Sequence, residues 1–422
     1  MAIDKRKFRL TLYLMPAMLD CITGIFIFIG PVRATLMGYD PLVAGSLVTA
    51  RSVACCLVGI LLSRIITPRN AIKLMFFSNI MLVWICLLGL AATNLTMLYV
   101  TTGLVGTFQV IFFSSFQLFM KMADEDDSKP LSRVVGSYTL AWCAGMSLGP
   151  FITGIAMRIG RTENGVGEGT GWMYAYLAAV VLTLALLAVL VKVSKESRAV
   201  ISRRWQGETI IGKTTAAAEG RPNLAWLGWF MGFFGLASSG IVKGVFPSGA
   251  TRAGMPEWRS GAVMMTMALA TGIFAYMLSR RWRWLYSGAS MLGFGLLGAA
   301  GLLFFLMPSL LGQGIADQAW QYYLAALIFG CYCGVAYLYS GFHALVHPQT
   351  AGRNISLNEC FISGGAIVGP LLGGWTAREY GFYTPFALAS ILVGVLGAFQ
   401  YYAHRKYGAI RQDCRPPLGK AA

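Results

Sequence analysis

The stretch Gly145-Met-Ser-Leu-Gly149-Pro150-Phe-Ile-Thr-Gly154 has a pattern that occurs twice in this chain. The second copy is Gly365-Ala-Ile-Val-Gly369-Pro370-Leu-Leu-Gly373-Gly374, which repeats Gly-x-x-x-Gly-Pro-x-x-x-Gly 220 positions later. Each copy lies within a long apolar segment, where small residues four apart let two helices approach closely. A proline is tolerated inside such a helix when neighbouring groups satisfy the freed carbonyl. The repetition predicts a chain built from a duplicated helical unit.

The composition indicates a protein of the lipid bilayer. Of the 422 residues, 56% are hydrophobic and only 12% are charged, and the mean hydropathy is +0.63. A soluble protein carries about twice that charged fraction, and apolar runs of about 18 residues or more recur along the whole chain. The net charge of +17 does not indicate a nucleic-acid partner, because the basic residues lie between apolar runs and form no stripe with aromatic residues. These features predict a polytopic membrane protein.

Twelve apolar segments have the length of membrane-spanning helices, so the predicted fold is all-α. They are residues 8–29, 42–63, 71–92, 97–120, 134–156, 171–193, 224–246, 261–278, 284–307, 322–343, 354–376 and 382–403. The one long polar stretch between spans, 194–222, is predicted to be a linker. The predicted organisation is a six-helix bundle at 1–193, this linker, a second six-helix bundle at 223–403 and a tail at 404–422.

The distribution of basic residues predicts the orientation in the membrane. With the N-terminus in the cytoplasm, 26 of the 34 Lys and Arg residues lie in or beside cytoplasmic segments. Such an excess is typical of the cytoplasmic side. We therefore expect both termini, the linker and the tail in the cytoplasm, and an integral protein of a bacterial cytoplasmic (inner) membrane.

The two halves also match each other outside the glycine–proline motif. With an offset of 216 positions, seven of the 22 residues from Gly24 to Gly45 are identical in the second half. The identical pairs are Gly24/Gly240, Ile25/Ile241, Pro31/Pro247, Ala34/Ala250, Thr35/Thr251, Gly38/Gly254 and Gly45/Gly261. Six is an even number of helices, so both halves enter the membrane in the same direction. The sequence therefore predicts two parallel repeats, related by an axis along the membrane normal.

Twelve spans, a basic central segment and a parallel six-plus-six repeat resemble the major facilitator superfamily over nearly the whole chain. The glycine–proline motif resembles the fifth-helix signature of the proton antiporters and exporters of that superfamily, and it is repeated here on the eleventh helix. The resemblance implies a transporter whose two halves rock around a central cavity near the membrane midplane. It also implies that helices one, four, seven and ten surround this cavity.

A second family motif, Gly-x-Leu-x-Asp-Arg, is partly present between the second and third predicted helices. Gly59 and Arg64 match it, whereas Ser63 occupies the position of the Asp. Arg133 and Arg353 occupy equivalent starts of the fifth and eleventh helices. We expect Gly59, Arg64 and these two arginines at a cytoplasmic gate.

Two charged residues lie deep within predicted spans, where a charge costs on the order of 3 kcal/mol unless it is paired or hydrated. Asp20 is about 18 Å from the cytoplasmic end of its predicted helix and Arg51 about 14 Å from the outer end of its own, so both lie near the midplane. Their helices are joined by a short turn, which predicts a buried Asp20–Arg51 pair. The pair is either structural, or Asp20 is the proton-coupling or substrate-responsive acid whose proton affinity Arg51 controls. The aligned Leu236 and Met267 of the second half favour function, since a pair that only holds the fold is expected in both repeats.

Other polar residues within spans are weaker candidates for the site. Glu359 is expected to meet protons or substrate, or to cap the inner gate, with Arg353 or His343 as its partner. Lys243 is expected to extend to the membrane surface. Uncharged side chains that could either line the cavity or pack in the core are Gln109, Trp142, Tyr332 and Tyr337.

The motifs of enzymes are absent from the sequence, which has no nucleophile elbow, zinc-protease helix or phosphate-binding loop. We expect no metal and no cofactor. The predicted function is secondary active transport of a small organic solute by alternating access, as a monomer, with coupling to protons and with export or antiport as the direction the motif resembles. Two alternatives stay open: an uncoupled facilitator, and a transporter-like receptor or assembly factor that moves no solute.

Overall fold

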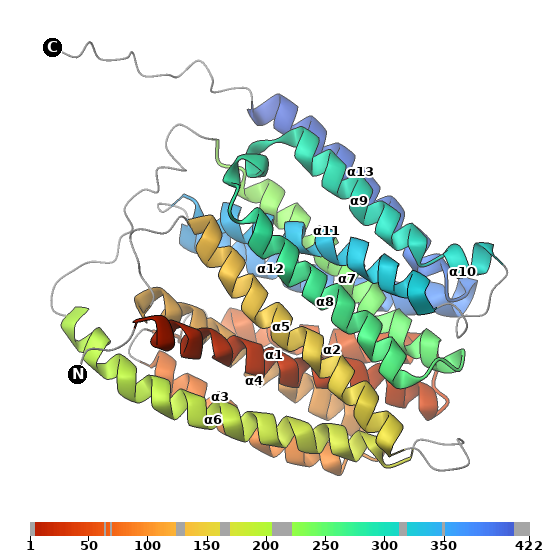
Figure 1. Ribbon diagram of the computed structural model, residues 1–422, viewed down its shortest axis with the longest axis horizontal. Coiled ribbons are helices and arrows are strands. Elements are labelled where there is room, and N and C mark those ends of the chain that lie inside the picture. The colour runs from red at the N-terminus through yellow and green to blue at the C-terminus, as the bar shows by residue number, and fades with distance from the viewer. Residues whose placement is uncertain are drawn as a thin grey trace.

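The computed structural model describes residues 5–62, 65–67, 70–123, 131–160, 169–204, 222–311, 319–347 and 351–408, and these residues contain helices and no strand (Figure 1). The helices of the first half are α1 (Lys5–Leu36), α2 (Pro41–Leu62), α3 (Ala71–Leu90), α4 (Leu95–Ala123), α5 (Leu131–Ile159) and α6 (Gly171–Arg204). Those of the second half are α7 (Ala225–Arg252), α8 (Glu257–Leu278), the 3-10 helix η1 (Trp282–Tyr286), α9 (Gly288–Phe304), α10 (Met307–Leu310), α11 (Ala319–Leu345), α12 (Ala351–Tyr380) and α13 (Thr384–Gly408).

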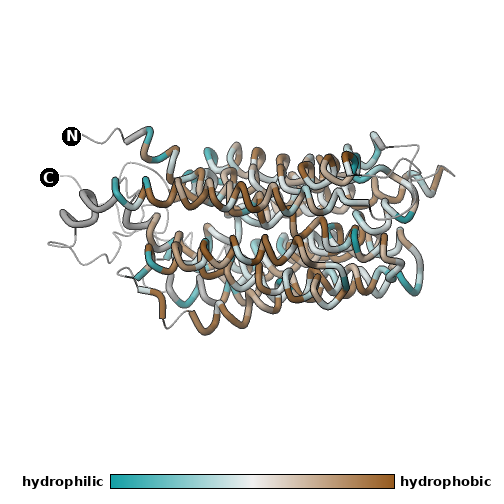
Figure 2. Tube along the Cα trace, turned by 90° about the horizontal axis from the view of Figure 1, so that it is seen from below, coloured by the Kyte–Doolittle hydropathy of each residue, from teal (hydrophilic) through white to brown (hydrophobic). Residues whose placement is uncertain are grey.

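Eleven of the described helices are long and apolar enough to cross a membrane. The remaining long helix, α9, is apolar but only 17 residues long, and the single turn of α10 follows it. Figure 2 shows hydrophobic residues along the middle of the bundle and hydrophilic residues nearer its two ends. With α9 counted, all twelve predicted helices are present, and the all-α membrane fold is confirmed.

The helices form two groups, α1–α6 and α7–α13, that lie side by side (Figure 1). Helix α1 begins and α13 ends at the same end of the bundle, which we name the terminal end; the opposite end is the far end. Two helices extend past their predicted limits at the terminal end. Helix α6 continues to Arg204, within the predicted linker, and α13 continues to Gly408, within the predicted tail.

The glycine–proline motif packs the same way in both halves. In the first half, a Cβ atom on Gly145 or Gly149 would collide with the α1 backbone, at Ala17 for the former. In the second half, Gly365 meets the α7 backbone at Phe233, which is Ala17 shifted by the 216 positions of the repeat. The small residues are therefore required by close helix contact, as the sequence predicted.

The last glycine of each motif joins the two halves. Gly154 of α5 lies against the start of α8 at Glu257, and Gly374 of α12 lies against the start of α2 at Pro41, again 216 positions apart. In the same two contacts, the carbonyl of Pro150 faces Gly261, and that of Pro370 faces Gly45. The repeated motif thus builds two equivalent interfaces, α5 with α8 and α12 with α2, that hold the far end of the bundle together.

Two of the identical residue pairs, Gly38/Gly254 and Ala34/Ala250, are explained by how α1 and α7 end. Gly38 and Gly254 have φ angles of +85° and +82°, which glycine adopts without strain. Beyond Gly38, the amide of Tyr39 donates to Ala34 at 2.9 Å, and beyond Gly254 the amide of Met255 donates to Ala250 at 2.9 Å. The same capping turn therefore closes both helices, as a duplicated unit requires.

Helices α1 and α7 are longer than predicted. Pro31 and Pro247 lie inside them, and both helices continue past these prolines to Leu36 and Arg252. The extra turns bury Arg33, whose guanidinium donates to the Ala92 carbonyl and lies 3.9 Å from the centre of the Trp172 ring. The expectation that these two helices end at residues 29 and 246 was wrong, because helix packing maintains each helix around its proline.

Candidate functional site

A hydrogen-bonded chain of three side chains lies in the middle of the first half. The side-chain amide of Gln109 on α4 donates to Oδ1 of Asp20 on α1 at 3.0 Å. Its carbonyl oxygen accepts from Nε of Arg51 on α2 at 3.0 Å and also from Nη2. All three residues lie near the middle of their helices, and Asp20 and Gln109 are buried.

The expected Asp20–Arg51 ion pair is therefore not direct. Among the described residues, no salt bridge joins Asp20 to Arg51, and Gln109 lies between them. Helices α1 and α2 are neighbours as predicted, but α4 also contacts both of them, which brings its glutamine between the two charges. Gln109 is hence a central member of the group and not simply part of a cavity wall.

Lys243 of α7 is a further charged residue at this place, contributed by the second half. It is close enough to Asp20 and Arg51 to interact with both electrostatically, and it is only partly exposed. The expectation that Lys243 extends to the membrane surface was wrong, because α7 continues nine residues beyond it to Arg252. The sequence did not reveal that α7 continues past Pro247, and Lys243 was therefore expected too close to the end of its helix.

Glu359 lies on α12, eight residues from the terminal end of that helix. It is exposed, and it is close enough to Cys55 of α2 and Tyr138 of α5 to interact with them electrostatically. Within the described part of the chain, neither a hydrogen bond nor an ion pair connects it to Arg353 or His343. The expected partnership was wrong: His343 is buried against Tyr339, and its ring nitrogen Nε2 lies 3.1 Å from the Leu285 carbonyl oxygen.

The aromatic candidates divide into two kinds. Trp142 of α5 and Tyr337 of α11 meet across the two halves, with ring centres 4.9 Å apart and planes at 86°. Tyr332 is fully buried and packs against Gly298 of α9 and Phe329, inside the second half. Of the two alternatives left open for Tyr332, the structure therefore supports packing in the core over lining the cavity.

The expected gate residues are at the terminal end as far as the structure describes them. Arg133 and Arg353 lie in the first turns of α5 and α12 and are exposed. Gly59 lies near the end of α2, against Val110 of α4. Arg64 lies outside the described residues.

The far end of the bundle holds polar contacts between the halves. Arg252 of α7 donates from Nη2 to the Tyr39 carbonyl at 2.8 Å, and Arg378 of α12 lies 3.9 Å from Asp40. Deeper in, Thr49 of α2 donates to the Ile367 carbonyl at 3.0 Å. These contacts and the glycine interfaces close the far end above the charged group.

Charge balance defines what the site can do. Two cations, Arg51 and Lys243, lie beside the buried carboxylate of Asp20, and a second carboxylate, that of the exposed Glu359, lies within electrostatic range of Cys55 on the same helix as Arg51. Within the described residues no group of His, Cys, Asp and Glu could hold a metal ion. Such a balanced set can exchange a proton or a charged solute without leaving a buried charge unpaired.

Two parallel six-helix halves around a buried charged group define a membrane transporter fold. The chain belongs to the major facilitator superfamily, because the model of that family matches residues 12–347. No curated protein sequence matches the chain. Among solved structures it is similar to the nucleoside transporter NupG, with a TM-score of 0.63 and 12% identity over 95% of this chain and 99% of NupG. A point mutant of NupG gives a TM-score of 0.62 and 12% identity, over 94% and 99% of the two chains. At this identity the similarity shows the fold alone.

Proposed function

We propose that this protein is a proton-coupled secondary active transporter of a small organic solute, working by alternating access in a bacterial cytoplasmic membrane as a monomer. The single observation that carries the proposal is the bridged arrangement of Asp20, Gln109 and Arg51 next to Lys243. A buried carboxylate that shares neutral and cationic partners has two stable states, one ionised and one protonated. Each state favours a different arrangement of its partners.

The two halves contribute different members of this group, which supports coupling to movement. Asp20, Gln109 and Arg51 belong to the first half, and Lys243 belongs to the second. Rocking of one half against the other changes the distance from Lys243 to Asp20, and therefore the Coulomb energy of the ionised carboxylate. Proton binding at Asp20 is then linked to the conformation of the bundle.

The position of the closed end supports one side of the membrane as the side from which the solute enters this conformation. The far end is closed by the Arg252–Tyr39 and Arg378–Asp40 contacts, whereas Glu359 is exposed nearer the terminal end. We infer that the solute enters this conformation from the terminal end, where Arg133 and Arg353 lie, and that this end faces the cytoplasm. Antiport, the function of the proteins whose fifth-helix motif this chain resembles, fits such a cytoplasmic entry.

The deciding experiment is Asp20→Asn in proteoliposomes, with a solute identified by a thermal-shift screen on the purified protein. The amide mimics a protonated acid, so the variant should keep counterflow of labelled solute but lose accumulation driven by a pH gradient. The matched control is Glu196→Gln, a carboxylate of α6, whose main contacts are with other helices of the first half. Accumulation by Asp20→Asn at the wild-type rate would remove Asp20 from coupling.

The same assay separates the other functions. An uncoupled facilitator shows counterflow with no effect of the pH gradient on the wild-type protein. A transporter-like receptor binds solute and shows no counterflow in any orientation of the vesicles. Neither result changes the family to which the chain belongs.

A further inference from the structure

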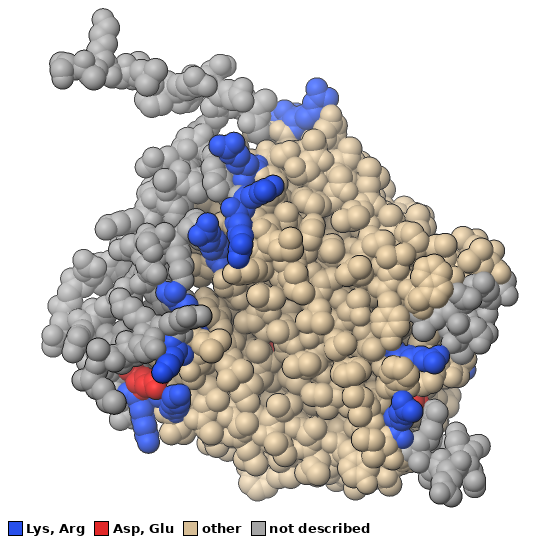
Figure 3. Space-filling view, viewed as in Figure 1, with Lys and Arg blue, Asp and Glu red and all other residues tan. Residues whose placement is uncertain are grey.

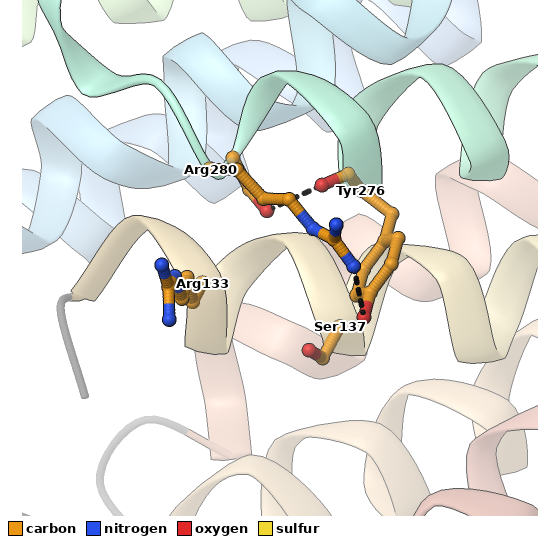
Figure 4. Close-up of a pocket in the computed structure, with 5 residues that line it drawn as sticks. Arg133, Ser137, Tyr276 and Arg280 are labelled. Carbon is orange, nitrogen blue, oxygen red and sulfur yellow. Dashed lines mark hydrogen bonds between the residues drawn. The ribbon is translucent and has the colours of Figure 1, made fainter. Parts of the chain in front are cut away.

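Two cavities at the terminal end are lined by arginines. The smaller, of about 360 Å³, lies between α5 and α8, with Arg133 and Ser137 on one side and Tyr276 and Arg280 on the other (Figure 4). Here Ser132 Oγ donates to the Ser279 carbonyl at 2.8 Å, which joins the two halves. The cavity therefore lies where the first half meets the second.

The larger cavity, of about 730 Å³, lies where α8 ends and α9 begins. Its wall contains Arg280, Arg281 and Arg283, and Leu278 and Trp284 give it an apolar side. Arg280 lines both cavities, so the two adjoin at this side chain. Ser287 and Ser290 at the start of α9 also line the larger cavity, and the amide of Ser290 donates to the Ser287 hydroxyl at 3.3 Å.

Among the described residues, the arginines of these cavities have no acidic partner. No Asp or Glu lines either cavity, and within the described ranges none of Arg133, Arg280, Arg281 and Arg283 forms an ion pair. Arg280 instead has a neutral partner: its Nη2 donates a hydrogen bond to the Tyr276 hydroxyl at 3.3 Å. Within the part of the chain that the structure describes, the four guanidinium groups therefore make an electropositive site.

The position of the larger cavity along the helices matches the membrane surface. It begins at Leu278, where the apolar span of α8 ends, and it extends to polar residues beyond that span. Figure 3 shows lysine and arginine side chains at the two ends of this face of the molecule, and none across its middle. A ligand in the cavity thus has its charge beside the arginines and its apolar part beside Leu278 and the span.

We propose that this pair of cavities binds the headgroup of an anionic phospholipid. Guanidinium groups bind phosphate oxygens in pairs, and basic pockets between membrane helices on the cytoplasmic side suit acidic headgroups. The apolar wall favours a lipid over free phosphate, because acyl chains can continue along α8. Since Arg133 and Arg280 belong to different halves, a headgroup held between them connects α5 to α8.

This site is separate from the one that carries the proposed transport. The lining residues lie on α5, α8, η1 and α9, whereas Asp20, Gln109 and Arg51 lie on α1, α4 and α2. Lipid binding can therefore be measured on the purified protein without any solute. A negative result here leaves transport untouched, and a negative transport assay leaves lipid binding untouched.

The test is native mass spectrometry of the full chain in detergent, titrated with phosphatidylglycerol, cardiolipin, phosphatidylcholine or inorganic phosphate. We expect retention of the two anionic lipids over phosphatidylcholine. Arg281→Gln/Arg283→Gln should weaken retention by about fivefold for each arginine removed, from the usual gain per basic residue at a membrane surface. The matched control is Arg405→Gln/Lys406→Gln, which removes the same charge from exposed positions of α13 at the same end that line neither cavity.

Three results would overturn the proposal. Equal retention by the cavity variant and the wild type shows that the arginines bind no headgroup. Equal loss in the cavity variant and the α13 control shows general charge attraction and no site. Full reproduction of the lipid's thermal stabilisation by inorganic phosphate shows a free-anion site instead. If the cavity variant does not fold, Arg280→Gln alone, which removes the residue shared by the two cavities, gives the same readout.

Discussion

The side chain of Gln109 lies between Asp20 and Arg51, donating to the carboxylate at 3.0 Å and accepting from the guanidinium at 3.0 Å. The Gln109 amide couples the protonation state of Asp20 to the position of Arg51, because the amide can rotate only by breaking its hydrogen bonds to both residues. When Asp20 gains a proton, its bond to the amide weakens, and the hold of Gln109 on Arg51 changes with it.

Gln109→Leu is expected to keep the fold and remove most of the transport. Hydrogen bonds to charged groups contribute about 1.5–3 kcal/mol each, so the loss corresponds to a decrease of roughly tenfold or more in the initial rate. Gln117→Leu is the matched control: it lies on the same helix and donates one neutral hydrogen bond, to the Tyr138 hydroxyl at 3.3 Å. Rates of counterflow for both variants test the prediction, and equal rates would contradict it.

Lys243→Gln is expected to lower the transport rate by at least about tenfold, while Lys243→Arg retains most of it. The reason is that Lys243 is one of two cations beside Asp20. Removing one partner of a buried charge costs more than about 1.4 kcal/mol, the free energy that corresponds to a tenfold change in rate. Lys192→Gln, on an exposed position of α6, removes the same charge away from the site. Identical rates for Lys243→Gln and Lys192→Gln would show that Lys243 takes no part.

Much of the fold could be predicted from this sequence, because the glycine–proline repeat is itself a record of helix contacts. Gly149 and Gly369 were expected at close interfaces, and each lies against the backbone of the first helix of its own half. The length of the apolar runs also predicted each long helix. Helix ends were less certain, since hydropathy falls at Pro31 and Pro247 although packing continues both helices beyond them.

The site was harder to predict, because a sequence places residues along a helix but not around it. The placement of Asp20 and Arg51 near the middle of their helices followed from counting residues, and the structure has both residues there. That Gln109 lies between them depends on how α4 is rotated against α1 and α2, which no local pattern specifies. The burial of Tyr332 against Gly298 could not be predicted for the same reason, since it depends on how α11 is rotated about its axis.

Gly369→Leu is expected to prevent correct packing of α12 on α7. A Cβ at this position would collide with the Ala237 carbonyl oxygen, and an overpacked core loses about 1–3 kcal/mol or more. Val368→Leu is the control, since Val368 is the preceding residue and is 44% exposed. Size-exclusion profiles and melting temperatures in detergent should show a loss for the glycine variant alone; a wild-type melting temperature for Gly369→Leu would contradict the close contact.

Arg252→Gln is expected to loosen the far end of the bundle and to shift the protein towards the conformation that is open there. In the present structure its guanidinium donates to the Tyr39 carbonyl across the halves at 2.8 Å, close to the Arg378–Asp40 contact. Removing one charged hydrogen bond costs about 1.5–3 kcal/mol, which is enough to change the ratio of two conformations by roughly tenfold or more. Arg259→Gln is the control, because that arginine lies at the same end but stacks near Trp258 within its own half.

The measurement is the labelling rate of Thr49→Cys by a membrane-impermeant maleimide added from the far side, in a background without other reactive cysteines. Thr49 is buried in the closed interface, so its cysteine should react about tenfold faster in Arg252→Gln than in Arg259→Gln. Equal rates in the two variants would mean that the Arg252 contact does not control access from the far end.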